Sequence, residues 1–385
     1  MVRSDFGFCP KSVIVGYLPK QIKEEQMTTT LQPGCRAMLI GSQPVSEHKE
    51  AADLVSTYAS EIPNWAQLPV FKQEGMVSQF ESGLPGLIHV ADKTFADTAG
   101  DHFDQEMVAF FEEYLAIAEQ VKTLEESRFV LTPELAKGFF ALQDALAEPP
   151  NNLFAVKGQI TGPITFCMAM KDQDGRAIFY NDALRDAANK LLALKAAWQI
   201  KQLSKYGVPV IIFIDEPSLA GFGSSEFISV SKEDIAASLH EVTDTIHAHG
   251  GLAGVHVCAN TDWSLLLAPE VDIVNFDAYG YFDKFILYAD QIKTYLVQGG
   301  CLAWGLVPTL QPDEVAAITE DSLWQLWQTQ MDQVGAAGID IERLKRQTFI
   351  TPSCGTGSLP VALSRKVLEL TNALSLKIRG INNKE

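Results

Sequence analysis

The stretch Leu252-Ala253-Gly254-Val255-His256-Val257-Cys258 places an imidazole and a thiol at the end of an apolar run. The run from Leu252 to Val257 has the length and composition of a short buried strand. Residues two apart on a strand point to the same face, so His256 and Cys258 can bind one metal ion together. The pattern predicts a metal site at the carboxyl end of a buried strand.

A third soft ligand is expected from Cys354, in the segment Thr351-Pro352-Ser353-Cys354-Gly355-Thr356-Gly357. This segment also follows a strand-like run, residues 348–350. Cys354 is too far along the chain from Cys258 for a zinc finger, whose ligands come in close local pairs. Ligands at the ends of separate strands indicate a catalytic metal held by a preformed scaffold.

The composition excludes several classes of partner. The 385 residues are 47% hydrophobic and 20% charged, which is ordinary for a globular protein, but the net charge is −18. Such an excess of acidic groups argues against nucleic acid and against an anionic membrane surface as partners. No run approaches the ~18 apolar residues of a membrane span. The six cysteines show no disulfide framework and no signal peptide is evident, so we expect a cytoplasmic location.

Strand-like and helix-like segments alternate along most of the chain. We expect residues 1–35 to form an N-terminal extension and residues 36–385 to form one catalytic domain. Strands are expected near residues 37–40, 65–71, 87–91, 154–156, 208–214, 252–257, 271–276, 301–307 and 348–350. Counting the runs at Met38, Leu87 and Phe154 gives eight strand–helix units, which favours an α/β fold of the closed (β/α)8 type, a TIM barrel. An open, doubly wound sheet is the alternative.

In such a barrel the carboxyl ends of the strands all face one mouth, where the catalytic groups collect. Six reactive side chains follow expected strands: Ser42, Asp215, His256, Cys258, Asp277 and Cys354. We therefore expect these six groups to converge on one pocket.

Five motifs resemble, in order, the catalytic barrel of cobalamin-independent methionine synthase: Ile40-Gly41-Ser42, Thr161-Gly162-Pro163, Asp215-Glu216-Pro217, His256-Val257-Cys258 and Cys354-Gly355. The resemblance extends over roughly residues 36–375, and the His-x-Cys pair with the distant Cys-Gly is its most specific part. It implies that His256, Cys258 and Cys354 bind zinc. It also implies that a substrate-binding region, formed by Ile40, Gly41, Ser42, Asp215 and Glu216, holds the amino-acid end of homocysteine.

The chain departs from the family at the fourth zinc ligand. The family has a glutamate at the end of the strand after His-x-Cys, whereas Asp277 stands there, with a side chain one methylene shorter. Asp277 then binds the zinc after a backbone shift, or instead supports the other ligands from outside.

The methyl donor is a second departure. The full-length family members carry another barrel that helps to hold folate, and short single-barrel relatives take the methyl group from a methylcorrinoid. The corrinoid-binding pattern Asp-x-His-x-x-Gly is absent here, so a corrinoid would arrive on a partner protein. Uroporphyrinogen decarboxylase, a member of the same superfamily, fits less well because its arginine-rich N-terminal signature is missing.

The ligand types indicate the chemistry. A thiol that coordinates zinc loses its proton, and two protein thiolates with a neutral imidazole leave the ion without net charge, so the bound sulfur stays electron-rich. This favours attack on a methyl group, whereas hydrolytic zinc sites use more histidine and carboxylate ligands. Asp215 would bind the substrate ammonium, and backbone N–H groups of Gly41 and Ser42 would bind its carboxylate.

We therefore expect a zinc-dependent methyltransferase acting on a thiol, with homocysteine as the first choice and a methylcorrinoid or folate as donor. The alternatives are transfer from a corrinoid protein to another thiol, such as a coenzyme thiol, and a non-catalytic zinc barrel that binds a corrinoid protein. Other groups are interpreted as structural: Cys9, Cys35, Cys167, Cys301, His247 and His249, the last two at a helix end.

Overall fold

The computed structural model describes residues 31–91, 93–222, 227 and 229–381. Most of the expected N-terminal extension, including Cys9, lies outside these residues. None of the described helices is both long and apolar enough to cross a membrane.

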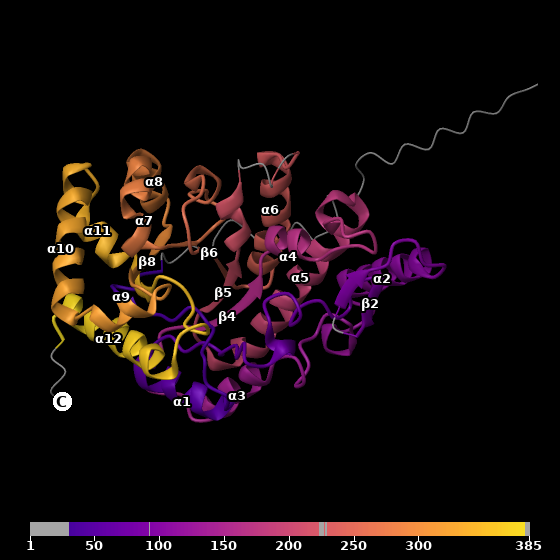
Figure 1. The fold of residues 1–385 in the computed structure, drawn as a ribbon, viewed down its shortest axis with the longest axis horizontal. Helices are drawn as coiled ribbons and strands as arrows, with labels where there is room; N and C mark the ends of the chain where they lie inside the picture. The colour runs from indigo at the N-terminus through magenta and orange to yellow at the C-terminus, as the bar shows by residue number, and fades with distance from the viewer. Residues whose placement is uncertain (1–30, 92, 223–226, 228, 382–385) are drawn as a thin grey trace, which may run out of the picture.

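Seven parallel strands form a curled sheet with helices around it (Figure 1). The order across the sheet is β1-β9-β8-β7-β6-β5-β4. The strands are β1 (Arg36–Ala37), β4 (Val156–Thr161), β5 (Val210–Asp215), β6 (Leu252–Val257), β7 (Ile273–Phe276), β8 (Cys301–Val307) and β9 (Thr348–Pro352). Strands that follow one another in the chain from β4 to β9 are neighbours in the sheet, which is the arrangement of a TIM-like α/β fold.

The helices cover the outside of the sheet (Figure 1). They are α1 (His48–Tyr58), α2 (Phe103–Ala118), α3 (Lys137–Ala145), α4 (Pro163–Ala169), α5 (Asp182–Leu203), α6 (Lys232–Ala248), α7 (Ala278–Phe285), α8 (Ala289–Val297), α9 (Pro312–Ala317), α10 (Glu320–Ala336), α11 (Ile341–Arg346) and α12 (Val361–Arg379). Strands β4, β5, β8 and β9 are buried along their whole length, as expected for parallel strands covered on both faces. A separate apolar cluster, which includes Met38, Phe213, Ile273 and Phe349, brings together side chains from several strands.

The segment from Asn64 to Gln67 lies between the two edge strands without forming a continuous ladder. Single parallel bridges join Ser42 to Gln67 and Asn64 to Lys157. Side-chain amides supply further contacts, since Gln159 Nε2 donates to the Trp65 carbonyl at 2.9 Å. Both edges therefore contact this segment, but the described residues show seven strands in the sheet and not a closed barrel of eight.

The expected sheet strand at Leu87–Ala91 is wrong. β2 (Leu87–Val90) pairs antiparallel with β3 (Lys93–Ala96) in a separate hairpin. A short apolar run does not reveal its partner, and here a positive φ of 53° at Ala91 turns the chain straight back. Ile88 and Val90 are consequently exposed, and the hairpin lies with α2 at one end of the molecule (Figure 1).

Candidate metal centre

Three of the predicted ligands meet at the ends of two strands. His256 lies at the end of β6, Cys258 follows it, and Cys354 follows β9. One ligand atom from each of the three lies within 4.8 Å of the other two. His256 is buried, while the two cysteines are partly exposed.

Hydrogen bonding within the protein accounts for one of the two imidazole nitrogens of His256 and leaves the other without a partner. Nδ1 forms a hydrogen bond with Oδ1 of Asn275, which lies in β7. Nε2 is buried and has no hydrogen-bond partner among the described residues. A buried nitrogen without a partner costs free energy, and a metal ion at this point would satisfy it. One imidazole and two thiols are a donor set that suits zinc, so these residues fit the metal that the sequence implies.

The protonation of the two cysteines is unequal. The neighbouring Cys354 thiol, and to a lesser extent His256, lowers the pKa of Cys258 to about 4. The same contact and burial raise the pKa of Cys354 well above its usual value. Burial lowers the pKa of His256, but Cys258 and Asp215 raise it more, so the net shift is upward. Cys258 therefore carries a negative charge in a largely buried place, which favours a cation beside it.

Asp277 is not part of this three-residue cluster. Its Oδ1 accepts a hydrogen bond from the Gly280 backbone N–H at 2.8 Å, which caps the amino end of α7. Burial raises the pKa of Asp277 to about 6. The carboxylate thus serves the helix, and the structure does not bring it to the other three ligands.

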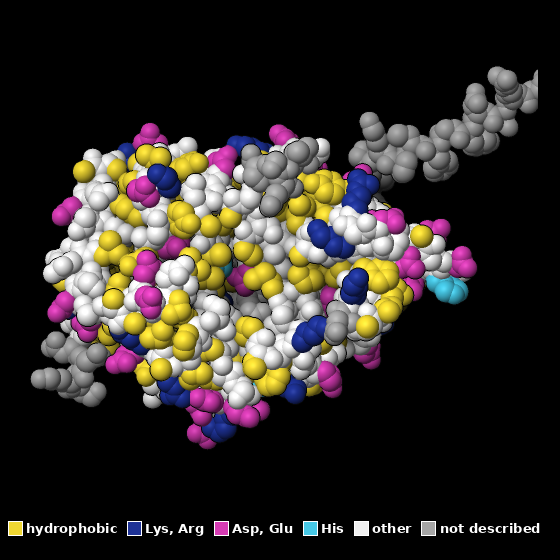
Figure 2. Space-filling view, viewed as in Figure 1, with side chains coloured by type: hydrophobic (Ala, Val, Ile, Leu, Met, Phe, Trp, Pro, Cys, Tyr) yellow, Lys and Arg dark blue, Asp and Glu magenta, His cyan; other side chains and the backbone are white. Residues whose placement is uncertain are grey.

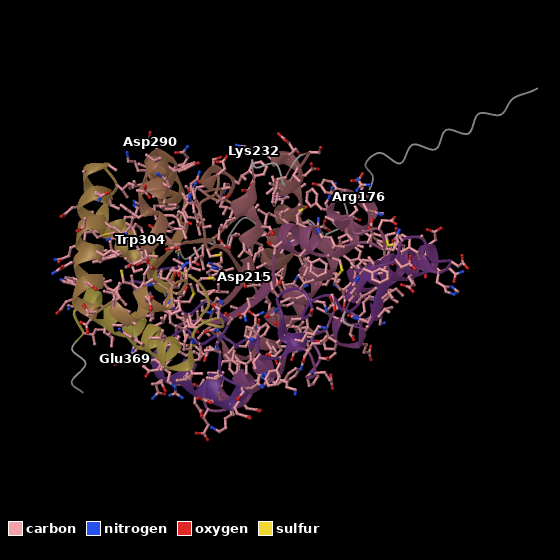
Figure 3. The ribbon with its side chains drawn as sticks, in the orientation of Figure 1. Arg176, Asp215, Lys232, Asp290, Trp304 and Glu369 are labelled. Atoms are coloured by element: carbon pink, nitrogen blue, oxygen red, sulfur yellow. The ribbon has the colours of Figure 1, made fainter. Side chains whose placement is uncertain are left out.

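Asp215 lies at the carboxyl end of β5, opposite His256 in the register of β5 and β6. Its Oδ1 is buried and has no hydrogen-bond partner among the described residues. Burial raises the pKa of this carboxyl, while His256 and Lys157 act in the opposite direction. A hollow is visible near the middle of the face in Figure 2, and Asp215 lies at that place in Figure 3. Asp215 therefore has an oxygen available for a ligand.

Glu216 points elsewhere. One carboxylate oxygen accepts from the Ile164 N–H at 2.8 Å, and the other accepts from the N–H and hydroxyl of Thr165 at 2.8 and 2.7 Å. These contacts fix the amino end of α4. A Cβ on Gly162 would lie 2.1 Å from Glu216 Cδ, so the glycine of Thr161-Gly162-Pro163 makes room for this carboxylate. Glu216 thus anchors a helix and does not reach the metal cluster.

The Ile40-Gly41-Ser42 segment lies beside Cys354. All three residues, with Cys354, line a small hollow. Ser42 Oγ accepts from the Gly357 N–H at 3.2 Å, and its carbonyl accepts from Thr356 N at 2.9 Å. Ser42 therefore holds the loop that carries Cys354.

Two buried polar side chains near the cluster were not predicted from the sequence. Asn275 contacts His256, and Lys157 donates to the Ile40 carbonyl and to Gln159 Oε1, the latter at 3.3 Å. Burial lowers the pKa of Lys157 to about 8. For Lys157 the sequence did contain an indication. In β4 the polar residues Lys157, Gln159 and Thr161 occupy every second position of a strand that is buried throughout.

Among the groups interpreted as structural, Cys35, Cys167, Cys301, His247 and His249 can be placed, while Cys9 lies outside the described residues. Cys35, Cys167 and Cys301 are buried, and burial raises the pKa of Cys35 and of Cys301 to about 12. At the end of α6, His247 Nε2 lies 2.7 Å from Asp272, and His249 Nδ1 lies 2.8 Å from the Thr245 carbonyl.

Comparisons with known proteins add little to this description. No protein-family model matches the chain, and no curated protein matches its sequence. A chitobiase from Flavobacterium johnsoniae has 10% identity and a TM-score of 0.34, over 91% of this chain and 52% of its own. The YdhT protein from Bacillus subtilis has 13% identity and a TM-score of 0.36, over 86% and 83%. The chain spans about half the length of the chitobiase, and at such low scores neither likeness carries an argument.

Proposed function

We propose that this chain is a zinc-dependent methyltransferase that methylates a thiol, with homocysteine as acceptor and methionine as product. The carrying observation is the cluster of His256, Cys258 and Cys354, with ligand atoms within 4.8 Å of one another and a buried Nε2 that lacks a partner. The five motifs that resemble cobalamin-independent methionine synthase support the same activity. The finer fold we propose is a closed eight-stranded barrel, with residues 64–67 as the remaining strand.

His256, Cys258 and Cys354 would hold the zinc ion. Zinc held by these residues would supply one thing, a lowered pKa for a bound substrate thiol. Two protein thiolates offset the charge of the ion, so the substrate sulfur remains a good nucleophile. The deprotonated substrate sulfur would form a bond to the methyl carbon, while the bond from the methyl group to its donor would break and leave its electron pair on the donor.

Asp215 supports an amino acid as the acceptor. Its unpartnered Oδ1 is beside His256, where it can accept a hydrogen bond from the substrate ammonium. Gly41 and Ser42 line a hollow together with Cys354, which supports a role for their backbone N–H groups in binding the substrate carboxylate. Glu216, which anchors α4, is left out of this role.

The donor is a methylcorrinoid, delivered by a partner protein, or a methylfolate. The site is proposed to work in a reducing cytoplasm, because Cys258 and Cys354 must stay reduced to bind metal, and both are free thiols in the structure. An assay with each donor separates the two possibilities.

The activity is tested by incubating the zinc-loaded protein with methylcobalamin and homocysteine. We expect loss of the methylcobalamin absorbance and formation of methionine, both abolished by Cys354→Ser and retained in Cys301→Ala. A protein that binds zinc but shows no thiol-dependent demethylation with either donor would instead be a binding partner of a corrinoid protein. Use of a coenzyme thiol without use of homocysteine would overturn the choice of acceptor.

A further inference from the structure

Asn275 is a fully buried polar residue in the middle of β7, in register with His256 on β6. Its amide contacts three groups. Nδ2 donates hydrogen bonds to the Ala303 carbonyl at 2.8 Å and to Thr351 Oγ1 at 3.0 Å. Oδ1 forms a hydrogen bond with Nδ1 of His256. The amide is thus hydrogen-bonded to one residue on each of three other strands, β6, β8 and β9.

The Ala303 carbonyl determines which way the amide points. A backbone carbonyl can only accept a hydrogen bond, so it requires the NH2 side of Asn275. The reversed amide would set two carbonyl oxygens against each other in a buried place and would lose one bond. Oδ1 is therefore fixed toward His256.

An amide oxygen can only accept, so the nitrogen that faces it must carry the hydrogen. Nδ1 of His256 is thus the protonated nitrogen, and the lone pair of the neutral ring is on Nε2. Nε2 is the buried nitrogen without a partner, and His256 is one of the three residues of the cluster. We propose that Asn275 is the positioning residue that selects Nε2 of His256 as the metal-binding atom and holds the ring in its ligating orientation.

The charge of the partner also matters, because Asn275 orients the ring without adding charge. A carboxylate in its place could also accept from Nδ1, but its second oxygen would face the Ala303 carbonyl without a hydrogen, and the site, which already contains two cysteines, would become more negative. Asn275 thus provides an oriented ligand while leaving the charge of the centre to Cys258 and Cys354. This inference rests on the metal centre of the proposed function, but the tautomer exists without metal and can be measured separately.

The first test is a proton–nitrogen correlation spectrum of the metal-free protein with isotope-labelled histidines, recorded at a pH high enough that the His256 ring is neutral. The His256 signal is assigned by its loss in His256→Gln. We expect hydrogen on Nδ1 in the wild type and in Asn275→Asp, which keeps the acceptor oxygen. We expect a mixture of tautomers in Asn275→Leu, which removes it. A wild type with hydrogen on Nε2, or an Asn275→Leu spectrum equal to that of the wild type, would overturn the proposal.

The second test is zinc affinity, measured by competition with a chromophoric chelator. Asn275→Leu should bind zinc roughly 10–100-fold more weakly, as is typical when the partner of a ligating histidine is lost. Asn275→Asp keeps the acceptor oxygen but loses the hydrogen bond to the Ala303 carbonyl, so it should bind zinc more tightly than Asn275→Leu and less tightly than the wild type. Thr351→Val is the matched control, since it removes one bond to the amide but keeps the Ala303 contact, and a change within about threefold is expected. Equal affinities in the wild type and in Asn275→Leu would refute the role. A wild type that binds no zinc would refute the metal centre and leave the tautomer result standing.

Discussion

The sulfur atoms of Cys258 and Cys354 lie within 4.8 Å of each other, although β7 and β8 separate the strands that these residues follow. On a flat sheet, three strand spacings would keep such groups about 14 Å apart. The curl of the sheet and the loop held by Ser42 bring the two thiols together. The fold thus creates a soft ligand pair that neither strand has alone.

Cys258→Ser should remove zinc without unfolding the protein. A serine hydroxyl does not replace a thiolate ligand, so we expect the zinc affinity to fall by more than the roughly 10–100-fold seen for partners outside the ligand sphere. Metal analysis after gel filtration measures the loss, and far-ultraviolet circular dichroism should be nearly unchanged. Cys301→Ala, in the core, is the control. An unfolded Cys258→Ser protein would mean that the metal is structural.

Gly355→Ala should disturb Cys354 through a steric clash with Ser42. A Cβ at this glycine would lie 2.1 Å from Ser42 Oγ, so the loop must shift and zinc affinity should fall. Because Ser42→Ala removes that oxygen, the double variant should bind zinc more tightly than Gly355→Ala alone. Affinities from chelator competition give the coupling between the two sites. Strictly additive effects would contradict the clash.

Asp215→Asn should affect acceptors according to whether they carry an ammonium group. Loss of a charged hydrogen bond costs about 1.5–3 kcal/mol, so KM for homocysteine should rise by roughly 10–100-fold. A simple alkyl thiol has no ammonium, and its kinetics should change little in this variant. Steady-state assays with both thiols make the comparison. Equal losses for both would place Asp215 in zinc binding or folding instead.

Lys195→Met should stabilise the protein at neutral pH. Lys195, on α5, is fully buried with one bond of 3.4 Å to the Val130 carbonyl, and burial lowers its pKa from 10.5 to about 7. Between these values the unfolded chain binds a proton that the folded chain does not, so the wild type gains stability as pH rises from 7 to 10.5. Methionine should therefore add about 4 kcal/mol to the free energy of unfolding at pH 7 and much less at pH 10.

Urea unfolding of both proteins at the two pH values checks this expectation. Lys201→Met, which removes a surface ion pair with Glu125, is the control and should change stability by less than about 1 kcal/mol. A Lys195→Met protein that is less stable than the wild type at pH 7 would contradict it.

Strand alternation was sufficient to predict that His256, Cys258 and Cys354 come together. His256 and Cys258 are two apart at the end of a strand, and Cys354 follows another. The adjacent acids Asp215 and Glu216 show the limit of reading motifs without that alternation. Neighbouring residues on a strand point to opposite faces, so only Asp215 lies beside His256, while Glu216 turns to α4.

Other features depend on contacts that local sequence does not encode. The hairpin at Leu87 and the segment at Trp65 are both short apolar runs, and only the fold shows that the second contacts the sheet. The sequence around Asn275 does not indicate a functional group, because its contact with His256 depends on the pairing of β6 and β7. The helix cap made by Asp277 likewise depends on how the chain turns into α7.

X-ray absorption at the zinc edge, recorded before and after addition of homocysteine, tests the central claim most directly. We expect one nitrogen neighbour and two sulfur neighbours from the protein, with zinc–sulfur distances of about 2.3 Å, and one more sulfur when homocysteine is bound. A zinc site with only oxygen and nitrogen neighbours, or a sulfur count that stays the same at saturating homocysteine, would contradict it.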